Sequence, residues 1–209
     1  MYDKQISVAV IRRLPRYYRY LGDLMEKDVV RISSKELSEK MGVTASQIRQ
    51  DLNNFGGFGQ QGYGYNVANL YAEIGKILGL DRKYNGIIVG AGHIGQAIAN
   101  YSDFERRGFK FVGIFDVDEK KIGTKVGELT VLSVDEMGSF VLDNNIHIAA
   151  LTVPKTRAAQ LANELTSLGV KGIWNFAPTD LHLPEDVTVE NVHLAESLMR
   201  LSYKLNAKD

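Results

Sequence analysis

The spacing of hydrophobic residues divides the chain into two parts with different rhythms. Up to about residue 80, apolar residues recur every three or four positions over residues 6–26, 45–55 and 67–78, which is the spacing of amphipathic helices. From Tyr84 onward, short apolar runs of strand length alternate with helical stretches. Because this alternation is typical of parallel sheets with right-handed crossovers, we expect the second part to be an α/β domain.

The N-terminal part has the pattern of a helix-turn-helix. Ser33 with Glu36, and Thr44 with Gln47, have the spacing of capping boxes at the starts of two short helices. Gly42 lies between these helices, as expected of a tight helix-turn-helix connection. The preceding helix, residues 6–26, contains a proline at position 15, which we place in the first turn of the longer helix because that position tolerates proline.

A glycine-rich stretch at residues 56–65 follows these helices directly. Its five glycines permit positive φ, and its aromatic residues can anchor both limbs on the domain. We interpret the stretch as a hairpin wing with its turn near Gln60 to Gly62. A last amphipathic helix ends at Gly79, so residues 1–80 are predicted to form an α+β, winged helix-turn-helix domain.

The C-terminal part is predicted to be a Rossmann-type domain over residues 81–192, with a separate helix in residues 193–209. The expected strands are 86–89, 109–115, 147–153 and 172–176, with an edge strand at 187–192, and the expected helices are 94–105, 134–144 and 156–168. The final helix, residues 194–206, places Leu194, Leu198, Leu201 and Leu205 on one face. Either the sheet of the same chain or a second subunit must cover this stripe.

A glycine motif predicts a dinucleotide site at the start of the second part. The apolar strand ends in Gly90-Ala91-Gly92-His93-Ile94-Gly95, a Gly-x-Gly-x-x-Gly turn that leads into a helix. The first glycine allows the tight turn, the second lets the backbone approach a pyrophosphate, and the third brings helix and strand together. The amides at the N-terminus of that helix are suited to phosphate.

An acidic residue at the end of the next strand indicates which dinucleotide binds. Asp116 lies 21 residues after Gly95, where an acid accepts hydrogen bonds from the ribose hydroxyls. Its charge repels a 2′-phosphate, and the following Val117 and Asp118 offer no adjacent arginine to bind one. NAD(H) is therefore favoured over NADP(H). A glycine turn without a bound dinucleotide is the alternative.

Composition and charge narrow the functional classes. The chain has no cysteine, so disulfides, thiolate metal sites and thiol redox sensing are excluded, and nothing in it suggests a metal. No apolar run reaches membrane-spanning length and residues 1–28 lack a secretory core, so we expect a cytoplasmic protein. Residues 1–80 hold 11 Lys/Arg against 8 Asp/Glu, the sign expected of a module that contacts phosphates, although a solvated basic helix has the same composition.

The sequence argues against a dehydrogenase. It contains no Tyr-x-x-x-Lys motif, and about 125 residues suffice for one Rossmann core without a substrate domain. Hydride transfer also needs a proton donor or acceptor. His93 lies in the glycine turn and His147 is expected to be a hydrogen-bonded core residue. Neither His182 nor His193 has an obvious carboxylate partner in the sequence.

Together these motifs resemble the Rex family of redox-sensing transcriptional repressors. The resemblance extends from about residue 8 to residue 203. The matching stretches are RLPRYYR at 13–19, SSxxL at 33–37, SQIRQDL at 46–52, GYGY at 62–65, the glycine turn at 90–95, FDVD at 115–118, TVP at 152–154, NFAP at 175–178 and VENV at 189–192.

The resemblance implies a homodimer whose C-terminal helix swaps onto the partner and which binds a palindromic operator. It implies that NADH binds the Rossmann domain and releases the DNA, whereas NAD⁺ is compatible with DNA binding. The residues it places on the nicotinamide side are Thr152, Val153, Pro154, Asn175, Phe176 and Tyr101. It further implies that Arg19 is linked to Tyr101 across the domains and that the position of His193 takes part in this coupling.

The sequence departs from the family pattern at Gln50, Gln60, Gln61 and His193. A lysine is common at the first position and a basic pair at the next two, so the recognition helix and the wing carry less positive charge than expected. Some members have an acid where His193 stands, so the link between arginine, tyrosine and acid is incomplete in this chain.

We expect Arg49 to read a base edge, with guanine in the major groove as its target. A phosphate contact or an internal contact with Asp51 is the alternative for this side chain. The other expected DNA contacts are Ser46, Gln47 and Gln50 on the same helix, Gln60, Gln61 and Tyr63 on the wing, and Arg12, Arg13 and Arg16 as phosphate contacts.

Two other functions stay open at this point. The chain could be an oxidoreductase, or a CoA- or ADP-ribose-binding protein, with an accessory domain that resembles DNA-binding modules. Alternatively, the winged helix could bind a protein.

Overall fold

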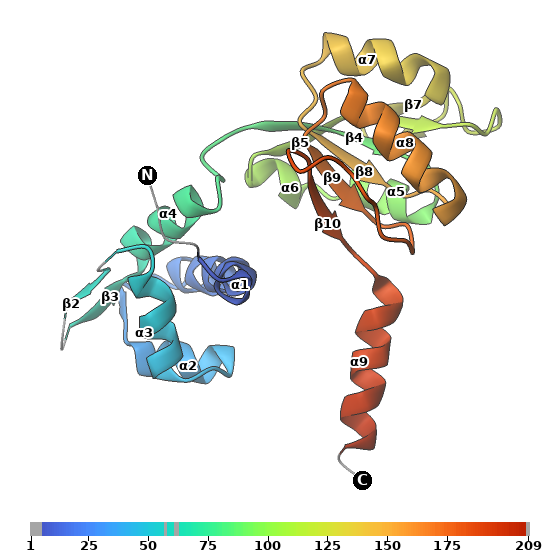
Figure 1. The fold of residues 1–209 in the computed structure, drawn as a ribbon. Coiled ribbons are helices and arrows are strands. Elements are labelled where there is room, and N and C mark those ends of the chain that lie inside the picture. The colour runs from blue at the N-terminus through green and yellow to red at the C-terminus, as the bar shows by residue number, and fades with distance from the viewer. Residues whose placement is uncertain (1–5, 57, 61–62, 208–209) are drawn as a thin grey trace. The chain divides into compact units, whose positions relative to one another are not determined.

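The structure is a computed structural model that describes residues 6–56, 58–60 and 63–207. The chain forms two compact units, Met1–Arg82 and Lys83–Asp209. Figure 1 shows helices and a small sheet in the first unit and a larger sheet with flanking helices in the second. The sequence analysis placed this division between residues 80 and 81.

The first unit is a winged helix-turn-helix. Its elements are α1 (Val8–Met25), β1 (Arg31–Ile32), α2 (Ser34–Met41), α3 (Ala45–Asn53), β2 (Gly59–Gln60), β3 (Gly64–Asn66) and α4 (Val67–Ile77). The strands form a small antiparallel sheet in the order β1–β3–β2. Helix α3, at the place of a recognition helix, follows α2 after a turn in which Gly42 has a φ of +65°. The turn expected at residues 60–62 falls partly outside the described residues.

The caps of α2 and α3 follow from the sequence, with one difference. At α2 the capping box is complete, because the Ser33 hydroxyl accepts from the Glu36 amide and the Glu36 carboxylate accepts from the Ser33 amide. At α3 the Thr44 hydroxyl accepts from the Gln47 amide at 3.1 Å. The Gln47 side chain donates to Asp51 instead, so the predicted second capping box is only half formed.

The expected position of Pro15 was wrong. Helix α1 begins at Val8, where the Ser7 hydroxyl caps it, and Pro15 therefore lies well inside the helix. An interior proline costs about 3 kcal/mol because it removes a hydrogen bond and crowds the preceding turn. The buried stripe of α1 outweighs this cost, and its members are Val10, Leu14, Tyr17, Leu21 and Leu24.

The second unit is built on a seven-stranded sheet in the order β10–β9–β8–β4–β5–β7–β6. Its strands are β4 (Tyr84–Val89), β5 (Phe109–Asp116), β6 (Lys125–Val126), β7 (Leu129–Ser133), β8 (Ile148–Leu151), β9 (Gly172–Asn175) and β10 (Thr188–Asn191). All neighbours pair in parallel except β6, which runs antiparallel to β7 at the edge. The sequence analysis missed β6 and β7, and the strand it expected at 147–153 is shorter.

Helices cover the two faces of this sheet. They are α5 (His93–Ala99), α6 (Asp103–Arg106), a 3₁₀ turn η1 (Val134–Glu136), α7 (Met137–Asp143) and α8 (Lys155–Ser167). Ile87 and Val89 pack with α7 and α8 on one face, whereas Ile88 packs with α5 and α6 on the other. The single helix predicted over 94–105 is divided into α5 and α6. Among the helices that the structure describes, none is long and apolar enough to cross a membrane.

The last helix, α9 (Leu194–Asn206), matches the predicted bounds and has no cover in the isolated chain. Every residue from Leu194 to Ala207 is exposed, and the four leucines of its stripe are between 51% and 68% exposed. Figure 1 shows it as a single rod that follows β10.

Candidate functional site

The centre of the large sheet has the geometry of a nucleotide site. Strand β4 lies between β5 and β8, so successive crossovers leave it in opposite directions and a crevice forms at the carboxyl ends of the strands. Gly90 follows β4 and Thr152 follows β8, and their backbones meet there. The Thr152 hydroxyl donates to the Gly90 carbonyl at 2.7 Å and lies 3.1 Å from the Val89 carbonyl.

The three glycines of the turn have different steric surroundings. Gly90 has a φ of +104°, and a Cβ there would lie 2.6 Å from the Thr152 carbonyl oxygen. A Cβ on Gly95 would lie 2.0 Å from the Gly90 carbonyl oxygen, so helix and turn touch at this point. At Gly92, by contrast, a Cβ would meet nothing within 4 Å. The turn thus leaves open space beside Gly92, which caps the N-terminus of α5. The first amides of a helix have no acceptor within the helix.

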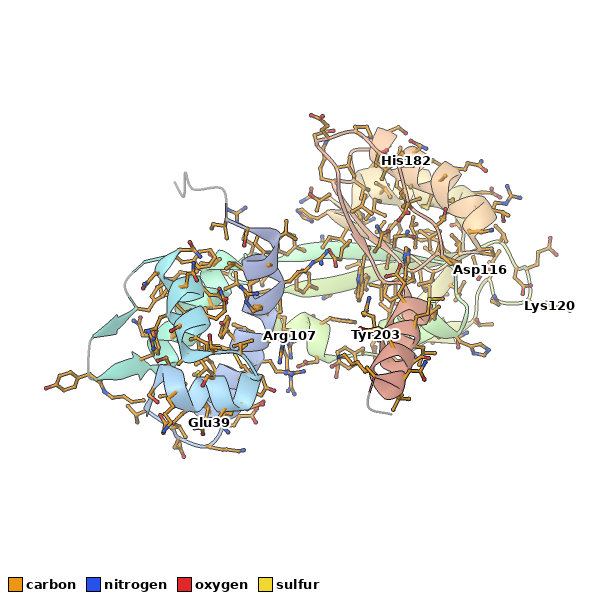
Figure 2. All side chains as sticks on the ribbon, turned by 60° about the horizontal axis from the view of Figure 1, so that its bottom comes forward. Glu39, Arg107, Asp116, Lys120, His182 and Tyr203 are labelled. Atoms are coloured by element: carbon orange, nitrogen blue, oxygen red, sulfur yellow. The ribbon has the colours of Figure 1, made fainter. Side chains whose placement is uncertain are left out.

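Asp116 is hydrogen-bonded to the glycine turn. The side chain lies at the end of β5 and is 8% exposed (Figure 2). One carboxylate oxygen accepts from the Ala91 amide at 2.7 Å and from the Lys121 ammonium at 3.1 Å, and the other accepts from the Asp118 amide at 2.9 Å. Burial alone would raise the pKa of Asp116, but these hydrogen bonds and the lysine charge together hold the pKa below its ordinary value. Asp116 is therefore a carboxylate, linked directly to the glycine turn.

This arrangement fits a dinucleotide. The open space beside Gly92 can admit a pyrophosphate, and an ionised acid lies at the distance from the turn where ribose hydroxyls bind. Next to it, His93 and Ile94 are exposed on the first turn of α5, and Val117 is exposed beyond Asp116.

The residues expected on the nicotinamide side follow β8 and β9. Val153 is half-buried and Pro154 is exposed at the start of α8. Asn175 is fully buried and its amide is used internally, because it donates to the Thr179 carbonyl and to Asn191. Its role in this structure is to hold the loop after β9. Phe176 packs edge-on against Trp174, with 4.6 Å between the ring centroids.

Of the expected coupling residues, Arg19 belongs to the first unit, and Tyr101 and His193 belong to the second. Tyr101 is 54% exposed and packs against Phe104, with 4.7 Å between the ring centroids. Arg19, in the other unit, is exposed and lies over the Tyr20 ring at 5.2 Å. His193 has the carboxylate partner that the sequence analysis did not recognise, since its Nδ1 lies 2.8 Å from Glu196 one helical turn later. His147 accepts a hydrogen bond from the Asn85 amide, as expected of a core histidine.

The first unit contains a buried charge network between α1 and α3. Asp51 is fully buried and accepts two hydrogen bonds from the Arg13 guanidinium, at 2.6 and 2.8 Å. The Tyr17 hydroxyl and the Gln47 amide each donate to the same carboxylate at 2.8 Å. Four donors thus satisfy one carboxylate, and α3 is tied to α1 through its inward face. Sequence reasoning missed this network because its members are up to 38 positions apart.

The network changes the expected DNA contacts. Arg13 was predicted to contact phosphate, but its guanidinium is taken by Asp51. Gln47 was predicted to contact DNA, but its amide is taken by the same acid. Arg49 does not use Asp51, the internal partner considered for it. Its guanidinium donates to Ser34 and Ser46 instead, at 3.1 and 3.0 Å.

The other candidate contacts lie mostly on the surface. Ser46, Arg49 and Gln50 are exposed on α3, and Arg12 is exposed on α1. Arg16 is also exposed, and its guanidinium donates to the Met41 carbonyl at the end of α2. On the wing, Tyr63 is 69% exposed, Gln60 belongs to β2, and Gln61 lies outside the described residues.

Low pH should lower the stability of the first unit, because Asp51 becomes protonated. Burial would raise the pKa of this carboxyl, but the hydrogen bonds from Arg13, Gln47 and Tyr17 hold the pKa below its ordinary value of 3.8. A depressed pKa contributes stability that is present above the unfolded value and is lost as pH falls through the folded value. We therefore expect the free energy of unfolding to fall as pH drops below about 4.

Chemical denaturation of Asp51→Asn between pH 3 and 7 checks this expectation. At pH 7 the free energy of unfolding of the variant should be lower by about 3 kcal/mol. This is the lower end of the range for a broken buried ion pair, because Arg13 is partly exposed. Its remaining pH dependence below 4 should be shallower than that of the unmodified protein. Asp23→Asn, which removes an exposed acid, is the matched control. Equal pH slopes for Asp51→Asn and the unmodified protein would contradict the assignment.

Comparison with known proteins agrees with both units. A family described as "Putative DNA-binding protein N-terminus" matches residues 5–53, and one described as "CoA binding domain" matches residues 81–179. Within the described residues, no group of three or more His, Asp or Glu side chains is placed to hold a metal ion.

Full-length relatives are similar over nearly the whole chain. The redox-sensing transcriptional repressor Rex of Clostridioides difficile (strain 630) is 60% identical over 201 residues, which cover 96% of each chain. The crystal structure of RSP in complex with β-NAD⁺ and operator DNA has a TM-score of 0.92 and 58% identity, over 99% of this chain and 95% of that one. RSP in complex with β-NADH has a TM-score of 0.90 and 55% identity, over 99% and 97%. The chain belongs to the Rex family of redox-sensing transcriptional repressors.

Proposed function

We propose that this protein binds a palindromic operator as a homodimer and releases it when NADH occupies the Rossmann unit, so that transcription responds to the ratio of NADH to NAD⁺. The open space beside Gly92, in the turn that is hydrogen-bonded to the ionised Asp116, is the observation that carries the proposal. The similar structures of RSP, with β-NADH and with β-NAD⁺ and operator DNA, support both halves of it. Since repression requires access to the chromosome, the cytoplasm is the proposed place of action.

In the Rossmann unit, Gly90, Ala91, Gly92, His93, Ile94 and Gly95 would hold the pyrophosphate. Asp116 would accept from the adenosine ribose, with Val117 beside it. Thr152, Val153, Pro154, Phe176 and Tyr101 would lie along the nicotinamide, and Asn175 would keep the loop after β9 in place through its internal hydrogen bonds. Tyr101 would connect this side to Arg19, with His193 as a third member.

In the winged unit, Arg49 is the residue proposed to read a base edge. Ser46 and Gln50 lie exposed beside it on α3, and Arg12 and Arg16 would contact phosphates. Gln60, Gln61 and Tyr63 on the wing would reach the minor groove. Arg13 and Gln47 leave the set of direct contacts because Asp51 holds both side chains.

The release of DNA follows from thermodynamic linkage. A dimer must hold its recognition helices about 34–36 Å apart, or a multiple of this, to read two half-sites. NADH releases DNA only if it binds an arrangement of the winged units that lacks this spacing. By reciprocity, operator DNA must weaken NADH binding by the same factor.

A gel shift on a palindromic operator tests the function. We expect NADH to abolish the shift and equimolar NADPH to leave it intact, because Asp116 repels the additional 2′-phosphate. Equal potency of the two coenzymes would remove the role given to Asp116. A complex that persists at saturating NADH, or the absence of any complex at low salt, would refute the proposal as a whole.

The match to a CoA-binding family makes CoA a second candidate ligand. CoA carries a phosphate on its adenosine ribose, and this phosphate would lie near the buried carboxylate of Asp116. We therefore expect CoA, tested in the same gel shift, to leave the operator complex unchanged. Release of the operator by CoA at lower concentrations than NADH would favour CoA as the effector.

A further inference from the structure

We propose that Lys121 is a specificity-determining residue: it is a latent binding group for a 2′-phosphate, and its ion pair with Asp116 is what keeps NADP(H) out of the site. The inference rests on the proposed function and concerns the choice between the two coenzymes. Next to Asp116 in the sequence, positions 117 and 118 hold a valine and an aspartate and no cation. The structure brings a cation from position 121 to the same carboxylate.

The geometry places Lys121 at the ribose side of the site. Its Nζ lies 3.1 Å from the Asp116 oxygen that also accepts from the Ala91 amide of the glycine turn. The same Nζ lies 3.9 Å from a carboxylate oxygen of Asp118. Asp116 is almost buried, whereas the Lys121 side chain is 37% exposed. The lysine side chain therefore borders solvent, whereas the carboxylate it pairs with does not.

Charge explains why this cation does not attract NADP(H) in the natural protein. Two carboxylates surround the ammonium, so the cluster already has a net charge of −1. A 2′-phosphate would add about 1.5 to 2 further negative charges at neutral pH. If Asp116 were neutral, the ammonium would face only Asp118, at the longer distance, and could pair with the incoming phosphate.

The number of hydrogen bonds that the Asp116 carboxylate accepts also places Lys121 next to the ribose. The oxygen shared by the Ala91 amide and Lys121 has both its lone pairs engaged, and the other oxygen accepts one hydrogen bond from the Asp118 amide. One acceptor position on the carboxylate is therefore free, and two ribose hydroxyls that donate to Asp116 need two. The second is the position that now accepts from Lys121. The lysine must shift when NAD(H) binds, and it remains next to the ribose.

Lys120 is a natural control for this proposal. It is the adjacent residue of the same loop and is exposed, and its backbone amide donates to Asp118. Within the described residues, the lysine that pairs with Asp116 is Lys121 and not Lys120. Figure 2 labels Asp116 at the end of its strand and Lys120 on the loop that extends beyond it.

The test measures coenzyme binding directly, by titration calorimetry and by the fluorescence of the reduced nicotinamide, on the full-length protein. Asp116→Asn keeps the shape of the side chain and one carbonyl oxygen, which can accept from the Ala91 amide or from the Asp118 amide. Asp116→Ser is a second, smaller neutral variant. We expect either to bind NADPH at least 10-fold more tightly than the unmodified protein does. Adding Lys121→Ser should remove this gain, and adding Lys120→Ser should retain it.

The outcomes separate this inference from the proposed function. If the Asp116→Asn single variant and its Lys121→Ser double variant bind NADPH equally, Lys121 does not supply the cation and the inference fails. If Lys120→Ser removes the gain as well, general loop charge and not Lys121 is responsible, and the inference also fails. NADH binding by the unmodified protein is the separate criterion, because its absence would refute the proposed function itself. Operator binding by each variant confirms that the protein is folded.

Discussion

Replacing Gly92 with alanine is expected to leave the fold and the operator complex intact but to shift the response to NADH to much higher concentrations. The backbone at Gly92 is extended, with a φ of −79°, and a Cβ there would meet nothing within 4 Å, so alanine fits the protein alone. In the proposed complex, however, the pyrophosphate occupies this space. A methyl group in a tightly packed position costs about 1–3 kcal/mol, which corresponds to NADH binding that is weaker by about 5- to 150-fold.

Calorimetric titration with NADH and a gel shift at increasing NADH check this expectation. Gly138→Ala is the matched control, because a Cβ at this position of α7 also meets nothing within 4 Å and Gly138 does not belong to the glycine turn. Gly95→Ala provides the opposite case, since its Cβ would lie 2.0 Å from a backbone oxygen and should destabilise the Rossmann unit. Unchanged NADH affinity in Gly92→Ala would show that no phosphate approaches this turn.

The second large effect is expected from Leu198→Glu in α9. Leu198 is 68% exposed in the isolated chain, so a glutamate costs nothing within the monomer. In a homodimer formed through this helix, the leucine stripe is buried, and each leucine contributes about 1.5–3 kcal/mol. Because a two-fold interface contains every substitution twice, we expect the dissociation constant of the dimer to rise by about 100-fold or more.

Analytical ultracentrifugation measures the dimer directly, and operator affinity follows from it. A monomer reads one half-site, and losing the second contact can weaken operator binding by about 10²- to 10⁴-fold. Lys204→Glu adds the same side chain to the polar side of α9, where Glu196 and Arg200 also lie, and should leave the dimer intact. A stable dimer of Leu198→Glu would show that the stripe has another partner.

The sequence predicted what depends on local pattern. The bounds of α9 were exact because four leucines recur at helical spacing between a strand and the C-terminus. The Rossmann-type fold followed from the glycine motif and from the acid 21 residues beyond it, which are close in sequence and fixed by one crossover. The winged helix-turn-helix followed from capping residues and glycines, whose conformational requirements are also local.

What the sequence could not predict depends on contacts between distant residues. The sequence analysis named Asp51 only as a possible internal partner of Arg49, whereas the fold brings Arg13 to it from α1. Pro15 was misplaced because helix propensity is weaker than the burial of the stripe on α1. The two-residue strand β6 was missed because it has no period to recognise and only its pairing with β7 defines it.

The network at Asp51 has a consequence for how new binding preferences can arise. Four hydrogen bonds to Asp51 fix the inward face of α3. Ser46, Arg49 and Gln50 are exposed and take no part in these four bonds, although Arg49 also donates to Ser34 of α2. Outward side chains can therefore be exchanged, in evolution or in a library, without tilting the helix that presents them. A scaffold of this kind lets operator choice diverge while the sensor stays the same.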